Sequence, residues 1–156
     1  MIVNNYFDTS ALCRRYHREP GSEVVEQVFE ESEARQYVSW LTMLETQSAF
    51  ALKVRTGEIT EPQLALLRSR LRADVVQHRL LVVRVLRRHF DRADQLLKVY
   101  GATIKLRTLD ALHLAISLDL QDRGLTQNLI TADATMAKVG GLEGMSIINP
   151  LRPTVP

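Results

Sequence analysis

Short segments rich in β-branched and aromatic residues alternate with longer segments of helical periodicity along the chain. The short segments predict strands at residues 2–7, 36–40, 80–85, 128–131 and 146–148. Capping residues and apolar spacing predict helices at 9–17, from 22, 42–56, from 60, 87–100, 108–120 and 134–139. The run 80–83 could equally continue the helix that contains Leu64. This alternation predicts a three-layer α/β/α fold around a mainly parallel sheet of about five strands.

Length and composition indicate one domain. The chain has 156 residues, 46% of them hydrophobic, which suffices for a core, and we expect a domain over residues 1–150 and a Pro-containing tail over 151–156. No apolar run exceeds four residues, whereas a membrane span needs about 20. Residues 1–7 lack the basic and apolar regions of a signal peptide. The single cysteine, Cys13, cannot form an intramolecular disulfide, so the sequence predicts a cytoplasmic protein without a membrane segment.

Charge is distributed unevenly, although the formal net charge is only +2. Residues 66–107 hold 11 Lys and Arg against 3 Asp and Glu. A separate acidic run at residues 19–33 contains no base, which is typical of a solvated helix face. The basic segment is a candidate for binding a polyanion, although the same arginines could simply solubilise exposed helices.

Four carboxylates fall where predicted strands give way to helices. Asp8 and Asp133 follow strands, and Glu45 and Asp110 are expected in the first turns of helices. Ligands of open parallel sheets bind beyond the carboxyl ends of the strands, so these four side chains are expected together. Each acid alone has a simpler explanation, because a carboxylate at a helix start accepts hydrogen bonds from free backbone amides. The segment 42–45 even has the form of a capping box.

Considered together, the four acids indicate a cation site. Four carboxylates at one sheet edge repel one another by roughly a few kcal/mol per close pair at intermediate dielectric. Arg107 is the one base that flanks them, and it cannot neutralise all four. Carboxylates with hydroxyl neighbours at Thr9, Ser10 and Thr131 favour Mg²⁺ or Mn²⁺ over zinc. Such an ion activates water and neutralises a phosphoryl oxygen, which suits phosphodiester hydrolysis.

Four segments carry a resemblance to a known family. They are Asp8-Thr9-Ser10-Ala11-Leu12, Leu41-Thr42-Met43-Leu44-Glu45, Leu106-Arg107-Thr108-Leu109-Asp110-Ala111-Leu112-His113-Leu114-Ala115 and Thr131-Ala132-Asp133, with Asn149-Pro150 near the end. With these motifs, residues 1–150 resemble PIN-domain proteins, and in particular the VapC-type toxin ribonucleases of type II toxin-antitoxin systems.

The resemblance implies a Mg²⁺-dependent endoribonuclease, with Mn²⁺ as a substitute, that a cognate antitoxin inhibits. Asp8 and Asp110 match the principal metal ligands of the family, Glu45 and Asp133 match the other two acids, and Thr131 matches a supporting hydroxyl, which Ser10 could also provide. Cleavage would leave a 5′-phosphate and a 3′-hydroxyl.

We also expect an apolar surface for an antitoxin helix or for a second copy in a homodimer. Its predicted residues are Val24, Val25, Val28 and Phe29 with the helix from Leu64.

Other interpretations come from other classes of protein. The main alternative is a noncatalytic interaction module whose acidic pocket grips a basic segment of a partner. A haloacid-dehalogenase-like phosphatase would need an Asp at position 10, and a response-regulator receiver would need an acid pair in place of Asn4 and Asn5. His113 lies three residues after Asp110, which invites a role at the site, but its apolar neighbours favour a packed, hydrogen-bonded histidine.

Overall fold

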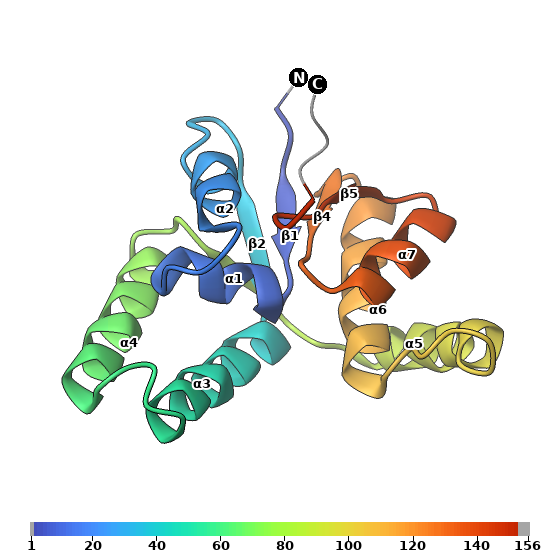
Figure 1. Cartoon of the computed structure of the whole chain (residues 1–156). Helices are drawn as coiled ribbons and strands as arrows, with labels where there is room; N and C mark the ends of the chain where they lie inside the picture. The colour runs from blue at the N-terminus through green and yellow to red at the C-terminus, as the bar shows by residue number, and fades with distance from the viewer. Residues whose placement is uncertain (1, 153–156) are drawn as a thin grey trace.

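The computed structural model describes residues 2–152 and contains one five-stranded sheet (Figure 1). The strands are β1 (Asn5–Phe7), β2 (Gln36–Ser39), β3 (Leu81–Val83), β4 (Asn128–Ile130) and β5 (Ser146–Ile148). Their order is β3-β2-β1-β4-β5, and all neighbouring pairs are parallel. The predicted α/β fold class is confirmed, and the ambiguous run at 80–83 contributes an edge strand. Residues 153–156 of the predicted tail lie outside the described residues.

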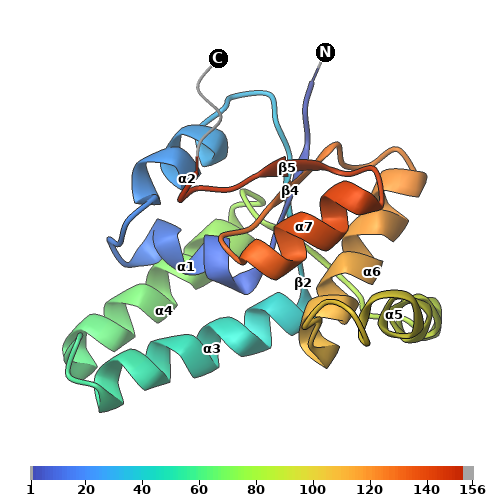
Figure 2. The ribbon, with the colours of Figure 1, turned by 45° about the vertical axis from the view of Figure 1, so that its right-hand side comes forward.

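Seven helices in residues 2–152 form the two outer layers. They are α1 (Thr9–Tyr16), α2 (Ser22–Phe29), α3 (Trp40–Arg55), α4 (Glu61–Val76), α5 (Arg87–Tyr100), α6 (Thr108–Asp122) and α7 (Ala134–Leu142). Helices α1–α4 cover one face of the sheet and α5–α7 cover the other (Figures 1 and 2). Strand side chains alternate between the layers, so Phe7 packs with α1–α4 whereas Tyr6 packs toward α6. No helix in this range is both long and apolar enough to cross a bilayer.

The start of α3 differs from the prediction. The helix begins at Trp40, and its capping box pairs Ser39 with Thr42 rather than Thr42 with Glu45. Glu45 therefore lies in the second turn, where it is not needed as a cap. The apolar spacing of the sequence predicts an inward face of Leu44, Ser48, Ala49 and Leu52, but Leu44 is 71% exposed and Leu52 is 48% exposed, so this prediction is wrong. The buried face consists instead of Thr42, Thr46 and Phe50.

Two further surface predictions change with the fold. The basic segment 66–107 is divided by β3, so that α4 and α5 lie on opposite sides of the sheet (Figure 1). Several of its arginines are already paired, as Arg88 is with Asp119 at 2.7 Å. The apolar face predicted for a partner on α2 is also wrong in part, because Val25 and Phe29 are buried in the protein's own core.

Asp74 on α4 ties that helix to α1. Its carboxylate accepts a hydrogen bond from Arg15 Nε at 2.9 Å and another from the Tyr16 hydroxyl at 2.7 Å. The side chains of Asp74 and Arg15 are each 8% exposed. Burial acts to raise the pKa of Asp74, but the hydrogen bonds from Arg15 and Tyr16 outweigh it and hold the pKa below its ordinary value.

The depressed pKa of Asp74 predicts a loss of stability in acid. An Asp whose pKa is lower in the folded than in the unfolded chain stabilises the fold above the unfolded value, about 3.9. That contribution is lost as the pH falls through the folded pKa. Urea unfolding should therefore show that the wild-type free energy of unfolding falls below about pH 4 more steeply than that of Asp74→Asn. Equal slopes for the two proteins would contradict this assignment.

Candidate metal site at the carboxyl edge of the sheet

Asp8 is the most buried of the four acids, with 3% of the residue exposed. It follows β1 and caps α1, since its Oδ1 accepts a hydrogen bond from the Ala11 amide at 2.8 Å. The Ser10 and Thr131 hydroxyls also donate to its carboxylate, at 2.8 and 2.6 Å. Burial raises the pKa of Asp8, and the opposing effects of the charge of His113 and of these hydrogen bonds do not cancel it. Such a carboxylate gains from a cation placed beside it.

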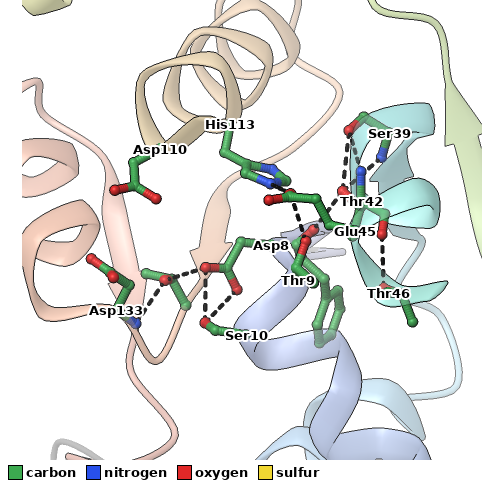
Figure 3. A network of polar contacts seen from close by, with 12 residues as sticks. Asp8, Thr9, Ser10, Ser39, Thr42, Glu45, Thr46, Asp110, His113 and Asp133 are labelled. Atoms are coloured by element: carbon green, nitrogen blue, oxygen red, sulfur yellow. Dashed lines mark hydrogen bonds and ion pairs between the residues drawn. The ribbon is translucent and has the colours of Figure 1, made fainter. Parts of the chain in front are cut away.

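The same two hydroxyls connect Asp8 to the loop between β4 and α7. The Ala132 amide donates to Ser10 Oγ at 2.9 Å, and the Asp133 amide donates to Thr131 Oγ1 at 3.0 Å. The hydroxyls of Ser10 and Thr131 thus each donate to Asp8 and accept from a backbone amide of the loop. This arrangement fixes the loop that carries Asp133 against the carboxylate of Asp8 (Figure 3).

Glu45 projects from α3 toward the same edge and is held by two donors. The Thr9 hydroxyl donates to its Oε1 at 2.8 Å, and His113 Nε2 lies 2.5 Å from the same oxygen. Burial acts to raise the pKa of Glu45, but the hydrogen bond and charge of His113 and the hydrogen bond from Thr9 outweigh it and lower the pKa. Glu45 is therefore held as a carboxylate.

Asp110 and Asp133 share one counterion, Arg107. Its Nε lies 3.0 Å from Asp110 Oδ2, and its Nη2 lies 3.6 Å from Asp133 Oδ2. Asp133 also caps α7 through a hydrogen bond from the Met136 amide at 2.8 Å. The Arg107 side chain is 69% exposed, so water screens these ion pairs and leaves the guanidinium easy to displace.

The structure brings all four predicted acids to the carboxyl edge of the sheet, around one space (Figure 3). Asp8 and Asp133 are caps as well, in agreement with the simpler explanation for each. The predicted hydroxyls also gather here, and that of Thr9 donates a hydrogen bond to Glu45. His113 is buried and hydrogen-bonded as predicted, but its contact with Glu45 was missed. Its spacing from Asp110 was the one sequence signal for it.

The donor set fits a hard divalent cation, because it consists of carboxylate and hydroxyl oxygens. In the conformation described, however, each acid has another partner. Accordingly, across residues 2–152 no three His, Cys, Asp or Glu side chains are arranged to hold a metal ion. To bind the ion, Asp110 and Asp133 would have to release their ion pairs with Arg107.

A groove of about 760 Å³ leads away from the acids between α1 and α3. Near the acids it is lined by Thr9, Ser10, Glu45 and Arg107, and farther along by Ser48, Leu52, Lys53 and Arg55, among others. Its lining mixes hydroxyl, basic, acidic and apolar groups, the acids being Glu19 and Glu58 besides Glu45, and it gives a larger molecule access to Glu45.

Residues 6–142 match the family model of the PIN domain. The chain belongs to the PIN domain family. This match covers the four acids and the sheet except for the first residue of β1 and the whole of β5, and it agrees with the resemblance noted in the sequence motifs. No curated protein sequence matches this PIN domain significantly.

Solved structures support the fold of this PIN domain. VapC20 of Mycobacterium tuberculosis, described as a toxin that cleaves the sarcin-ricin loop, has a TM-score of 0.65 at 14% identity and covers 96% of this chain and 99% of its own. FitAcB from Neisseria gonorrhoeae has a TM-score of 0.63 at 17% identity, with coverage of 94% and 97%. A toxin-antitoxin complex from Klebsiella pneumoniae has a TM-score of 0.58 at 19% identity, and the match covers 94% of this chain and 97% of the chain in the complex.

Proposed function

We propose that this PIN domain is a Mg²⁺-dependent endoribonuclease and the toxin of a toxin-antitoxin pair. The observation that carries the proposal is the gathering of Asp8, Glu45, Asp110 and Asp133 from four separate segments at one edge of the sheet, beside a groove that Glu45 lines. Asp8, Asp110 and Asp133 would be costly neighbours without a cation, because Arg107 is the only basic side chain among the described residues that forms an ion pair with any of the three.

Asp8 and Asp110 would hold the ion, with Glu45 and Asp133 completing the set of acids. When bound, Mg²⁺ would neutralise a phosphoryl oxygen and lower the pKa of a water molecule. Ser10, which contacts both carboxylate oxygens, and Thr131, which contacts Oδ2, hold the Asp8 side chain in place. Glu45 or Asp133 would take the proton of the attacking water, and the cleavage would leave a 5′-phosphate and a 3′-hydroxyl.

RNA would reach the acids through the groove between α1 and α3. Because the arginines of residues 66–107 are divided between two sides of the sheet, they cannot form one continuous track. Arg107 is the basic residue of that segment that lines the groove. Once the ion neutralises the acids, its guanidinium would be free to contact a phosphate.

The proposed partner is a cognate antitoxin, and a homodimer is the proposed assembly of the toxin. Similar folds occur in complexes described as toxin-antitoxin pairs, which supports the first proposal. Leu52 and Leu109 are exposed beside the groove and would be covered by such a partner. Cys13 is a free, buried thiol, which suits the reducing cytoplasm that we propose as its location.

One observation favours the alternative of a noncatalytic module. Arg107 already shows that Asp110 and Asp133 accept a guanidinium, so an arginine of a partner could occupy the same place. Such a module would bind a basic peptide and cleave nothing.

Incubation of the purified, partner-free protein with total cellular RNA separates the two functions. We expect discrete fragments with 5′-phosphate ends in Mg²⁺ and none in EDTA. Intact RNA in Mg²⁺, together with tight binding of an arginine-containing peptide, would contradict the nuclease and support the module.

Arg107 and the ion compete for the same two acids in this proposal. Arg107→Gln removes the competing guanidinium and its repulsion of a cation. The Mn²⁺ dissociation constant should therefore fall by about two- to fivefold, as expected for loss of exposed ion pairs. Isothermal titration measures this change, and Arg87→Gln is the control, because its exposed arginine pairs with Asp91 on α5 and with none of the four acids. Weaker binding by Arg107→Gln would contradict competition.

A further inference from the structure

We propose that His113 is a positioning residue that fixes the carboxylate of Glu45 at the edge of the acid site. The proposal deepens the proposed function and rests on it, because Glu45 is there assigned to the ion or to its water. His113 lies on α6, one turn after Asp110, and is 3% exposed. Its Nε2 lies 2.5 Å from Glu45 Oε1 (Figure 3).

The opposite side of the imidazole is anchored as well. His113 Nδ1 lies 2.9 Å from the hydroxyl of Tyr6, a residue of β1 that is completely buried. The Tyr6 hydroxyl in turn donates to Ser39 Oγ at 3.1 Å. Both ring nitrogens are thus engaged, and the ring cannot turn about its side-chain bonds without breaking a buried hydrogen bond.

The chain of contacts closes on the helix that carries Glu45. Ser39 caps α3, and its hydroxyl lies 3.1 Å from that of Thr42 in the first turn. The path therefore runs from the start of α3 through Tyr6 and His113 back to Glu45 in the next turn. Because this path of contacts links the Glu45 carboxylate to the start of its own helix, the carboxylate keeps one position relative to α3.

The two donors to Glu45 meet at one oxygen and leave the other available. Thr9 Oγ1 and His113 Nε2 both contact Oε1. Within residues 2–152 no hydrogen bond reaches Oε2. Oε1 is thus fixed by two hydrogen bonds, and Oε2 is left able to contact an ion or a water molecule. A histidine that merely filled the core would not need this contact with a partly exposed acid.

Direct titration with Mn²⁺ tests the role without any RNA. We expect His113→Leu to weaken Mn²⁺ binding by about tenfold, the usual effect of losing a residue that orients a ligand. His113→Gln keeps a donor toward Glu45 and should recover part of that loss. Tyr6→Phe keeps the aromatic ring and removes the hydroxyl that contacts His113 and Ser39, so it should give a smaller loss in the same direction. Circular dichroism checks that each variant folds. If His113→Leu does not fold, Tyr6→Phe provides the test instead.

A double-mutant cycle separates positioning from a general structural effect. In a Glu45→Ala background, His113→Leu should change the Mn²⁺ affinity by less than about twofold, because the side chain that it positions is gone. An equal loss with and without Glu45, or no loss in the single variant, would overturn the proposal.

A metal-free measurement keeps this result distinct from the proposed function. In the nuclear magnetic resonance spectrum, the proton on His113 Nε2, the nitrogen that faces Glu45, should be shifted downfield and slow to exchange. Glu45→Ala should abolish that signal. If the wild-type protein binds no Mn²⁺, the proposed function fails, while the contact is judged by this proton alone. Absence of the signal in the wild-type protein would overturn the positioning role.

Discussion

Asp8→Asn is expected to lower the rate of Mg²⁺-dependent RNA cleavage by on the order of 100- to 1,000-fold. The substitution removes the charge of the most buried acid of the site, which is the charge that would attract the ion. It should leave the fold intact, because Asn caps a helix about as well as Asp and keeps an acceptor for the Ala11 amide. The measurement is the initial rate of cleavage of an RNA that the wild-type protein cuts.

Asp94→Asn is the matched control for Asp8→Asn. Asp94 lies on α5 and pairs with Lys98, and both side chains are mostly exposed. The same change of carboxylate to amide should therefore leave cleavage within about twofold of the wild-type rate, since an exposed ion pair contributes little. Comparable losses in the two variants would show that cleavage does not depend specifically on the acid site. Undiminished cleavage by Asp8→Asn would contradict the role of Asp8 in holding the ion.

The second large effect is on stability. Asp74→Ala should lower the free energy of unfolding by about 3–5 kcal/mol, because it leaves the buried Arg15 without its main partner. The same change removes the acceptor of the Tyr16 hydroxyl, which joins α1 to α4. Urea unfolding at neutral pH measures the loss.

Asp91→Ala is the control for Asp74→Ala. Asp91 pairs with Arg87 four residues away, and the two side chains are 59% and 89% exposed. This substitution should cost less than about 1 kcal/mol. A loss at Asp74 no larger than the loss at Asp91 would contradict the assignment of the Asp74 cluster as a structural connection.

Four of the five strands were predictable because their segments are short, rich in β-branched and aromatic residues, and separated by capped helices. The run that forms β3 was left open, because its apolar residues could equally have continued a helix. The last strand was placed at residues 146–148 from its sequence, as the structure has it. The start of α3 was not predictable in the same way, because two threonines and a serine near residue 40 offer competing caps. The fold selects Ser39, since its hydroxyl also meets the buried Tyr6 on the neighbouring strand. Local sequence does not contain that tertiary contact.

The acids were predictable as a group for a topological reason. In a parallel sheet every strand delivers its following residue to the same edge, so Asp8 and Asp133 had to lie at one edge once their strands were assigned. They are neighbours because β1 pairs with β4, a strand order that the sequence did not predict. The pairing of Arg107 and His113 with the acids depends instead on side-chain directions, which spacing along one helix does not determine. The division of the basic segment was hidden as well, because it follows from the helices on either side of β3 occupying opposite faces.

Isothermal titration of the RNA-free, partner-free protein with Mn²⁺ tests the central claim most directly. The wild-type protein should bind the ion, and Asp8→Asn combined with Asp110→Asn should abolish the binding while circular dichroism shows an unchanged fold. Absence of binding in the wild-type protein, or equal binding by the double variant, would contradict a metal site built from these carboxylates.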